Sequence, residues 1–416
     1  MAGARVWITG VGVVTPLGLD VPSTWEAAVA GRSGIGPLTR FDSKEFQCHF
    51  AGEVSDFDPL TRLDRRDVKN MDRYAQFGAY AALEAVADSG LDWDREDLDR
   101  IGVVTATGIG GIETLVREND VLRQKGPSRV SPRLIPSLMA NGLAGYLAMR
   151  YGIRGPNLTT VTACTSSAHA IGEATRKIQL GEADVMLAGG SEAVLVPFAF
   201  AGFEAIRALS RRNGDPRRAC RPFDRDRDGL VMGEGGAILV LESEEHARKR
   251  SARPYAEVLG YGMSADAHHL VEPDPTGSGA SLAMIRCLKD AQVPADEVDY
   301  VNAHATATVK GDIAETLAIH EAFGPHAERL AISATKAMHG HLLGAGAALE
   351  LALTMLSMRD GIALPTLNLE NPDPECDLDY VPLTAREMRI RTAISNSFAF
   401  GGHNVSLLVR KVAESS

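Results

Sequence analysis

The sequence predicts an α/β fold with buried sheets, and two features of the chain carry this prediction. Short, wholly apolar runs rich in β-branched residues alternate with longer segments of helical spacing. Many of these segments end at one of the 41 glycines, which favour tight turns and close backbone contacts. Because the strands are apolar on both faces, helices should cover both faces of each sheet.

In the first part of the chain, four strands and two helices are expected. The first strand should end in a glycine turn, and the fourth should close at Gly189-Gly190. The helices should end at Gly90 and Gly181, which suit a left-handed C-terminal cap. The expected strands are Arg5–Thr9, Ile101–Thr107, Val161–Ala163 and Asp184–Ala188, and the expected helices are Arg73–Ser89 and Thr165–Leu180.

The second part repeats the pattern, with strands expected at Ala256–Tyr261, Asp299–Ala303 and Ala331–Ala334. The segment Ala345–Met358 is apolar on nearly every face, so we expect a helix buried between layers. A strand, a small-residue turn and a helix follow one another at Cys164 and again near His341, which hints at internal duplication. The halves should meet near residue 250, with the charged run Glu242–Arg250 as a solvated surface segment.

Composition excludes several classes of protein. A formal net charge of -11 argues against a general nucleic-acid binder, although a local basic patch for an acidic partner stays open. No window has about 18 uninterrupted apolar residues, so no membrane span is expected. The five cysteines are far apart and form no CxxC pair, which argues against a disulfide framework or a zinc site. We therefore expect a cytoplasmic protein.

Cys164 lies where an apolar segment turns into a helix, among small residues that leave the sulfur accessible. Unpaired amides at the start of a helix stabilise a thiolate, which is the nucleophilic form, and could also hold an oxyanion. The alternative is that Cys164 is a small buried apolar residue, the commonest role of a free cysteine.

Three further clusters could carry chemistry. His304 follows an expected strand, where ligands of open α/β sheets bind, or its ring is satisfied by the backbone. Lys336 and His341 precede the apolar helix that holds Glu350, so a structural Lys336–Glu350 ion pair is an alternative. The segment Asn396–Asn404 sets aromatic residues beside paired glycines, as in a gating loop or an ordinary turn.

In this order along the chain, these signals resemble the β-ketoacyl-acyl-carrier-protein synthases, closest to the elongating class II enzymes. The resemblance implies a thiolase fold, with two similar halves, each a five-stranded mixed sheet between helices, layered αβαβα. The halves would span residues 1–250, with the nucleophilic cysteine, and 251–416, with the two histidines. Further matching segments are Arg221-Pro222-Phe223-Asp224, Arg227-Asp228-Gly229, Gly233-Glu234-Gly235 and Pro365-Thr366-Leu367-Asn368.

The resemblance implies a decarboxylative Claisen condensation in fatty-acid chain elongation. Cys164 would accept an acyl group from acyl carrier protein, and His304 and His341 would promote decarboxylation of malonyl-carrier protein. The resulting enolate would attack the Cys164 thioester, giving a 3-oxoacyl-carrier product and CO2. The amides of Cys164 and Phe400 would form the oxyanion hole.

Supporting roles follow from the same resemblance. Lys336 and Glu350 would support the catalytic groups, with Lys336 tuning the electrostatics around His341, and Phe400 would also gate the site. No cofactor of the enzyme itself is implied, since the phosphopantetheine arm belongs to the carrier. The remaining matched positions are Thr306 and Thr308 for the pantetheine arm, Ile109 and Phe203 for an acyl pocket near a homodimer interface, and Arg66, Lys69 and Arg207 for the surface that meets the carrier, unless these three are solvated surface charges.

Five residues depart from the usual family pattern and indicate a divergent member: Ala305, Ala307, His339, Ala399 and His403. The Cβ of Ala399 restricts its backbone and could stiffen the gate. An alternative function is therefore the ketosynthase of a specialised type II polyketide or polyene pathway, which could need a silent partner subunit as a heterodimer.

Other readings fit less well. A silent subunit would characteristically lack Cys164, and an initiating synthase would have Asn in place of His341. A thiolase would need a second catalytic cysteine, and Cys376 lies in an acidic loop. The early Gly10-Val11-Gly12 is not followed by the pattern of a dinucleotide-binding helix.

Overall fold

Ten strands form one continuous mixed sheet in the computed structural model, which describes residues 3–413. The strand order β10-β9-β13-β14-β8-β1-β7-β6-β4-β5 divides into two sets of five, joined where β1 pairs with β8. The strands are β1 Val6–Val14, β4 Ile101–Ala106, β5 Asn157–Thr160, β6 Val185–Glu192, β7 Gly235–Ser243, β8 Ala256–Ala265, β9 Tyr300–Asn302, β10 Ala331–Ser333, β13 Thr392–Ala399 and β14 His403–Arg410.

The two sets share one topology. In each, the strands run in the order first, fifth, fourth, second, third across the sheet. In each, the two outermost pairings are parallel, while the pairings next to the junction are antiparallel. The duplication that the sequence hinted at is therefore visible in the strand order.

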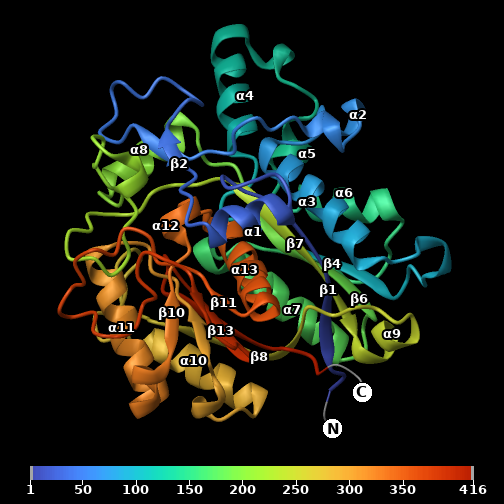
Figure 1. Ribbon diagram of the computed structural model, residues 1–416. Helices are drawn as coiled ribbons and strands as arrows, with labels where there is room; N and C mark the ends of the chain where they lie inside the picture. Colours follow the sequence, from blue (N-terminus) through green and yellow to red (C-terminus); the bar gives the residue numbers. More distant parts are fainter. Residues whose placement is uncertain (1–2, 414–416) are drawn as a thin grey trace.

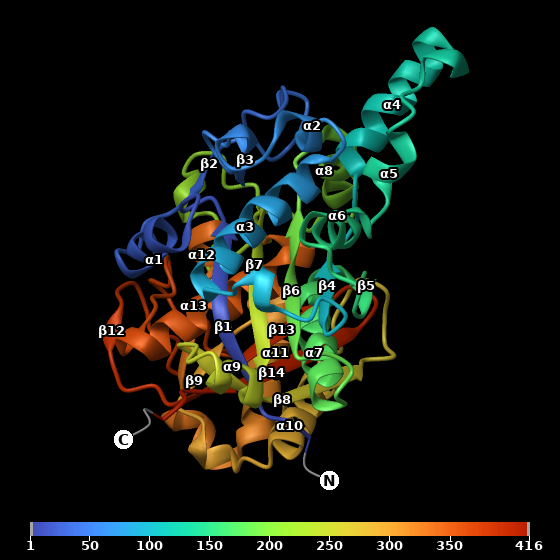
Figure 2. The ribbon, with the colours of Figure 1, turned by 90° about the vertical axis from the view of Figure 1, so that its right-hand side faces the viewer.

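Helices separate and cover the two five-stranded sets of this sheet, which are called the first and the second sheet below. α3 and α6 pack on the outer face of the first sheet, α7 and α13 lie between the sheets, and α10, with α11 beside it, covers the second sheet (Figures 1 and 2). This is the predicted αβαβα layering. The helices are α1 Val21–Val29, α2 Arg65–Val68, α3 Arg73–Ser89, α4 Ile112–Lys125, α5 Leu134–Leu138, α6 Gly142–Tyr151, α7 Ser166–Gln179, α8 Pro197–Ala205, α9 Glu244–Lys249, α10 Ser278–Ala291, α11 Val309–Phe323, α12 Lys336–His339 and α13 Gly346–Asp360.

Two helix predictions match closely. α3 spans Arg73–Ser89 and ends at Gly90, whose φ of 66° is the left-handed conformation that glycine adopts easily. α13 is buried along its whole length from Gly346 to Met358, as its uniformly apolar sequence predicted. α4 projects from the body of the molecule (Figure 2). Within residues 3–413, no helix has the length and apolar character needed to cross a lipid bilayer.

The expected glycine turns are wrong at two strands. β1 continues through Gly10 and Gly12, and β6 continues through Gly189-Gly190 to Glu192. A Cβ on Gly12 would lie 2.0 Å from the carbonyl oxygen of Ala81 on α3. These glycines of β1 allow a helix to pack closely on a strand, a role that sequence reading cannot separate from a turn.

Two other expectations are also wrong. The strand expected at Val161–Ala163 ends earlier, at Thr160, and Val161 is exposed where the chain leaves the sheet. The charged run Glu242–Arg250 is not wholly solvated, because Glu242 is fully buried on β7. Its carboxylate accepts hydrogen bonds from Thr9, His246 and Arg250, which supply the partners that a buried charge needs.

Candidate active site

Cys164 lies in a single 3-10 turn, Ala163–Thr165, between β5 and α7. Ala163 has a φ of 51°, a strained left-handed value for a residue with a side chain. Ser166 fixes the turn, since its hydroxyl donates to the carbonyl of Ala163 (2.6 Å) and accepts from the amide of Thr162 (2.8 Å). The sharp turn that the small residues predicted directs the sulfur into a cavity.

His304 follows β9 and is positioned by Glu315 on α11. The two carboxylate oxygens of Glu315 accept hydrogen bonds from the backbone amides of His304 (2.8 Å) and Ala305 (2.7 Å). Burial raises the pKa of Glu315 to about 7. Glu315 was not among the predicted site residues, because nothing in the local sequence separates it from the other acidic residues of α11, Asp312 and Glu321.

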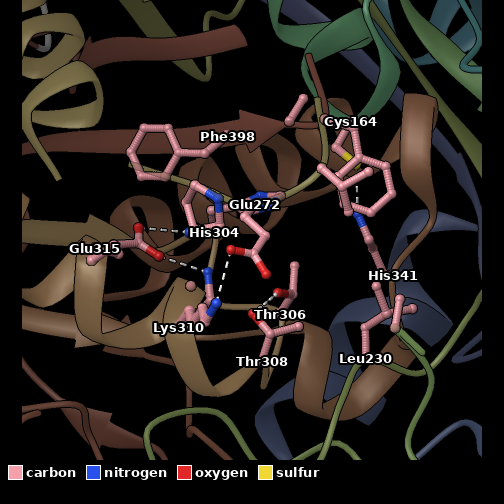
Figure 3. Close-up of a pocket in the computed structure, with 18 of the residues that line it drawn as sticks. Cys164, Leu230, Glu272, His304, Thr306, Thr308, Lys310, Glu315, His341 and Phe398 are labelled. Atoms are coloured by element: carbon pink, nitrogen blue, oxygen red, sulfur yellow. Dashed lines mark hydrogen bonds and ion pairs between the residues drawn. The ribbon is translucent and has the colours of Figure 1, made fainter. Parts of the chain in front are cut away.

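His341 lies between α12 and α13, and its amide donates to the carbonyl of Val231 (2.7 Å). Its Nε2 is 2.9 Å from Sγ of Cys164, and its ring centroid is 5.4 Å from that of His304. Figure 3 shows the sulfur facing this imidazole, with His304 on the same cavity. Residues from both halves of the chain therefore meet at one point.

Burial sets the protonation states of these three groups. It raises the pKa of Cys164 to about 12, and the charge of Lys336 opposes the shift. It also holds the pKa values of His304 and His341 well below the usual 6.5, with Lys336 adding to the effect. At neutral pH the site contains a thiol and two neutral imidazoles. Burial thus outweighs the charge of Lys336, so the thiol needs a base to form the nucleophilic thiolate.

Lys336 and Glu350 form a fully buried ion pair beside the site. Burial raises the pKa of Glu350 to about 7, and Lys336 limits the rise. Neither residue lines the cavity. The ion pair considered as an alternative is thus present, and the charge of Lys336 also lowers the pKa of both histidines.

The cavity that contains Cys164 has a volume of about 360 Å³. Of the expected binding residues, Thr306, Thr308, Phe203, Arg207 and Phe400 line it. The hydroxyls of Thr306 and Thr308 are 3.1 Å apart. Ile109 does not line this cavity and is 43% exposed, while Arg66 and Lys69 lie on the surface at α2.

The segment Asn396–Asn404 comprises the end of β13, a tight connection at residues 400–402 and the start of β14. The candidate gate residue Phe400 therefore lies in a turn between two strands. The backbone of Phe400 opposes the rise in the pKa of the Cys164 thiol that burial causes, and the ring of Phe400 stacks on that of Phe203 with 6.2 Å between centroids. Gly401 and Gly402 supply the left-handed conformations, with φ of 82° and 73°. Ala399 lies in β13 outside the left-handed region, so its Cβ causes no backbone strain.

The other unusual residues have distinct surroundings. Ala305 and Ala307 are buried, and Ala307 has a left-handed φ of 63°. His339 is fully buried, with Nδ1 on the carbonyl of Gly340 and Nε2 near the hydroxyl of Thr335. Burial lowers the pKa of His339 to about 3, so it is a neutral packing residue. His403 packs edge to face against His169, at 6.5 Å between ring centroids.

A candidate metal site is not found within residues 3–413, where no group of three or more His, Cys, Asp or Glu side chains is arranged to hold an ion.

Comparisons with known proteins show which family the chain resembles. Residues 4–247 match the family "Beta-ketoacyl synthase, N-terminal domain" and residues 255–370 match "Beta-ketoacyl synthase, C-terminal domain". Among curated proteins, the chain is 48% identical to 3-oxoacyl-[acyl-carrier-protein] synthase 2 of Synechocystis sp., covering 98% of both chains. It is 47% identical to the protein of the same name from Coxiella burnetii, covering 99% of this chain and 100% of that protein.

Solved structures of the same family also superpose on this chain. The ishigamide ketosynthase/chain length factor superposes with a TM-score of 0.93 at 36% identity, and a beta-ketoacyl synthase from Burkholderia phymatum with 0.92 at 37%. A type II polyketide ketosynthase in complex with its acyl-carrier protein gives 0.91 at 34%. In each case 99% of this chain and 100% of the other is covered. The chain therefore belongs to the beta-ketoacyl synthase family, and it has the thiolase fold that the sequence predicted.

Proposed function

We propose that this enzyme is an acyltransferase that condenses an acyl group on Cys164 with malonyl-acyl-carrier-protein, giving 3-oxoacyl-acyl-carrier-protein and CO2. The observation that carries the proposal is the 2.9 Å contact between Sγ of Cys164 and Nε2 of His341, with the ring of His304 5.4 Å from that of His341. One cavity thus holds a nucleophile, a base beside it and a second imidazole.

The first half-reaction transfers the acyl group to the enzyme. As the sulfur attacks the acyl carbonyl, its proton moves to His341, whose pKa well below 6.5 keeps it available as a base. The tetrahedral oxyanion is held by the amides of Cys164 and Phe400. The pantetheine thiol leaves with the proton that His341 returns, so the enzyme carries an acyl thioester and no net charge change.

The second half-reaction forms the carbon–carbon bond. His304 and His341 donate N–H hydrogen bonds to the thioester oxygen of the malonyl group as CO2 leaves. For His341 this step uses the tautomer with the proton on Nε2, whereas acylation uses the tautomer in which Nε2 accepts. The enolate carbon attacks the Cys164 thioester, and the sulfur departs as a thiolate. The thiolate then takes a proton from solvent, so each CO2 released consumes one proton. Burial strengthens these hydrogen bonds because water does not compete for the oxygen. Lys336 acts through its charge on both imidazoles, with Glu350 as its counterion.

Fatty-acid chain elongation is the pathway we propose. The curated relatives at 47–48% identity are named 3-oxoacyl-[acyl-carrier-protein] synthase 2, whereas the polyketide and ishigamide ketosynthases are only 34–36% identical. The specialised pathway raised by the unusual alanines is therefore the less favoured alternative.

Binding roles are proposed for the remaining residues. Thr306 and Thr308 would hold the pantetheine arm, Phe203 the acyl chain, and Phe400 would gate the site; Arg66, Lys69 and Arg207 would meet an acidic carrier protein. Ile109, exposed and apolar, would complete the acyl pocket in a homodimer. We place the boundary between the two halves of the chain at residues 250 and 251, in the connection from β7 to β8. No cofactor beyond the carrier's own arm enters the reaction as proposed.

Intact-protein mass spectrometry tests the proposal. After incubation with a series of acyl-carrier proteins, Cys164 should gain the acyl mass and lose it on addition of malonyl-carrier protein, with release of a 3-oxoacyl product. A protein that gains no adduct from any acyl-carrier protein would contradict the proposal.

A further inference from the structure

An ion pair crosses the solvent side of the active-site cavity. Lys310, in the first turn of α11, contacts Glu272, in the connection between β8 and α10, with Nζ and Oε2 2.8 Å apart (Figure 3). Both side chains line the cavity that contains Cys164, and they are 64% and 52% exposed. Lys310, Glu272 and Arg207 are exposed residues of the cavity lining, and the part of the cavity that they line is called here the cavity mouth.

Glu272 differs from three other carboxylates that line this cavity. Asp228, Asp266 and Asp274 each accept hydrogen bonds from neighbouring amides, hydroxyls or an asparagine side chain. Among residues 3–413, the carboxylate of Glu272 has Lys310 as its single polar partner. An ion pair this exposed adds little stability, so a competing anion can displace Glu272 at small cost.

The surroundings of Lys310 suit an anion. Thr308 is the N-cap of α11 but makes no side-chain capping bond, and the first amides of a helix have no acceptor within it. The helix dipole adds positive potential at this end of a 15-residue helix. Arg207 also lines the cavity and is exposed, and none of the ion pairs found among residues 3–413 includes it. The mouth thus offers a displaceable lysine, a free arginine and helix amides beside Thr306 and Thr308.

We propose that Lys310 exchanges Glu272 for the phosphate of the incoming pantetheine arm, so that the ion pair selects phosphate-bearing substrates at the cavity mouth. This inference rests on the proposed function, which brings such an arm past Thr306 and Thr308 to Cys164. Glu272 holds the lysine in place when the cavity is empty, and the phosphate takes over the same ammonium group when the arm is bound. No covalent bond changes, since one anion replaces another on Lys310.

The test compares two small substrates that differ in the phosphate alone, malonyl-4′-phosphopantetheine and malonyl-pantetheine. The readout is the KM for the phosphate-free compound divided by the KM for the phosphorylated one. Lys310→Gln should lower this ratio about tenfold, because a charge-assisted hydrogen bond is lost, and Lys310→Arg should restore most of it. Glu272→Gln should raise the ratio about threefold, since Lys310 then has no competing carboxylate.

Matched controls are Lys289→Gln and Glu321→Gln, both exposed and outside the cavity lining, which should leave the ratio unchanged. Equal changes in both KM values for Lys310→Gln, or no rise for Glu272→Gln, would overturn the inference. Calorimetric titration of the unacylated enzyme with 4′-phosphopantetheine and pantetheine reads the same preference without turnover. A wild-type enzyme that binds the phosphorylated arm preferentially but never condenses would refute the proposed function alone; one that condenses with an unmoved ratio in the variants would refute this inference alone.

Discussion

The two halves of the molecule share a strand order but place different chemistry at equivalent strand ends. After its third strand, the first half presents Cys164, the proposed nucleophile, whereas the second half presents Lys336 and then His341. After its second strand, the first half has the small turn at Thr107-Gly108, whereas the second has His304. The two halves share a scaffold, and the different residues at their strand ends separate the proposed nucleophile from the groups proposed to stabilise charge.

A buried carboxylate anchors the second-strand loop in both halves, but from different elements. Glu315 on α11 holds the amides of His304 and Ala305, while Glu192 at the end of β6 accepts from the amides of Gly108 (2.5 Å) and Gly344 (3.0 Å). Because Gly344 belongs to the second half, Glu192 also ties the halves together beside the site. The comparison teaches that the site forms between the halves, so neither half is chemically complete.

The largest effect should come from removing the nucleophile of the first half. Cys164→Ala should reduce condensation by about 10³-fold or more, since no acyl-enzyme can form. Release of CO2 from malonyl-carrier protein should remain measurable, because the second half keeps both histidines. Parallel assays of product and CO2 separate the half-reactions, with the buried, non-lining Cys220→Ala as control. Undiminished condensation by Cys164→Ala would remove the nucleophile from the first half.

Removing either histidine of the second half should slow the decarboxylation of the malonyl group. His304→Ala and His341→Ala should each slow CO2 release by about 10²- to 10³-fold, the usual cost of losing one oxyanion donor. Acylation of Cys164 should slow further in His341→Ala than in His304→Ala, because His341 alone contacts the sulfur. The half-buried His320, on the outer part of α11, provides the control His320→Gln. Normal CO2 release by either alanine variant would show that the pair does not act on the malonyl group.

The pH dependence of acylation tests whether the thiol proton of Cys164 moves to His341 of the other half. Burial raises the pKa of Cys164 to about 12 and keeps that of His341 well below 6.5, so the neutral pair is the resting state from pH 6 to 8. Transfer of the thiol proton to His341 needs no hydroxide, so the acylation rate should be nearly flat over this range. In His341→Ala the sulfur must lose its proton to solvent, and the rate should rise about tenfold per pH unit. A wild-type rate that climbs equally steeply would contradict proton transfer between the halves.

The smallest expected effect concerns the two carboxylate anchors. Burial raises the pKa of Glu315 and of Glu192 from 4.5 to about 7. Between these values the folded state keeps a proton that the unfolded chain has lost, so each group's stabilising contribution falls as pH rises from about 4.5 to about 7 and is constant above. The variants Glu315→Gln and Glu192→Gln lack the titrating carboxyl group. In each variant the unfolding free energy should therefore fall less steeply with pH than in the wild type, by up to about 1 kcal/mol per pH unit.

Urea unfolding at pH 5, 6 and 7 measures this slope, with exposed Glu321→Gln as the matched control. A variant that is less stable than the wild type by the same amount at every pH has lost hydrogen bonds alone. A variant whose unfolding free energy changes less steeply with pH has lost the titrating group. If both variants keep the wild-type slope, the two anchors do not bind protons as their burial requires.

Much of the fold followed from local patterns. The extent of α3 and the burial of α13 were readable because helical spacing, a terminal glycine and a uniformly apolar face are properties of neighbouring residues. Gly12 and Gly189 were misread as turn residues because the reason for each glycine is a close backbone contact with another part of the chain. Glu242 was misread as solvated because its partner Thr9 lies 233 residues away.

The sequence by itself determined which residues could do the chemistry: Cys164 in its small-residue turn, His304 after a strand, and His341 before a buried helix. Tertiary structure alone decided that Nε2 of His341 meets a sulfur 177 residues away, that Glu315 holds the loop of His304, and that the thiol rests protonated. The physical reason is that protonation states and hydrogen-bond partners depend on burial and on neighbours in space. A local sequence pattern fixes the type of side chain but not the water it loses on folding.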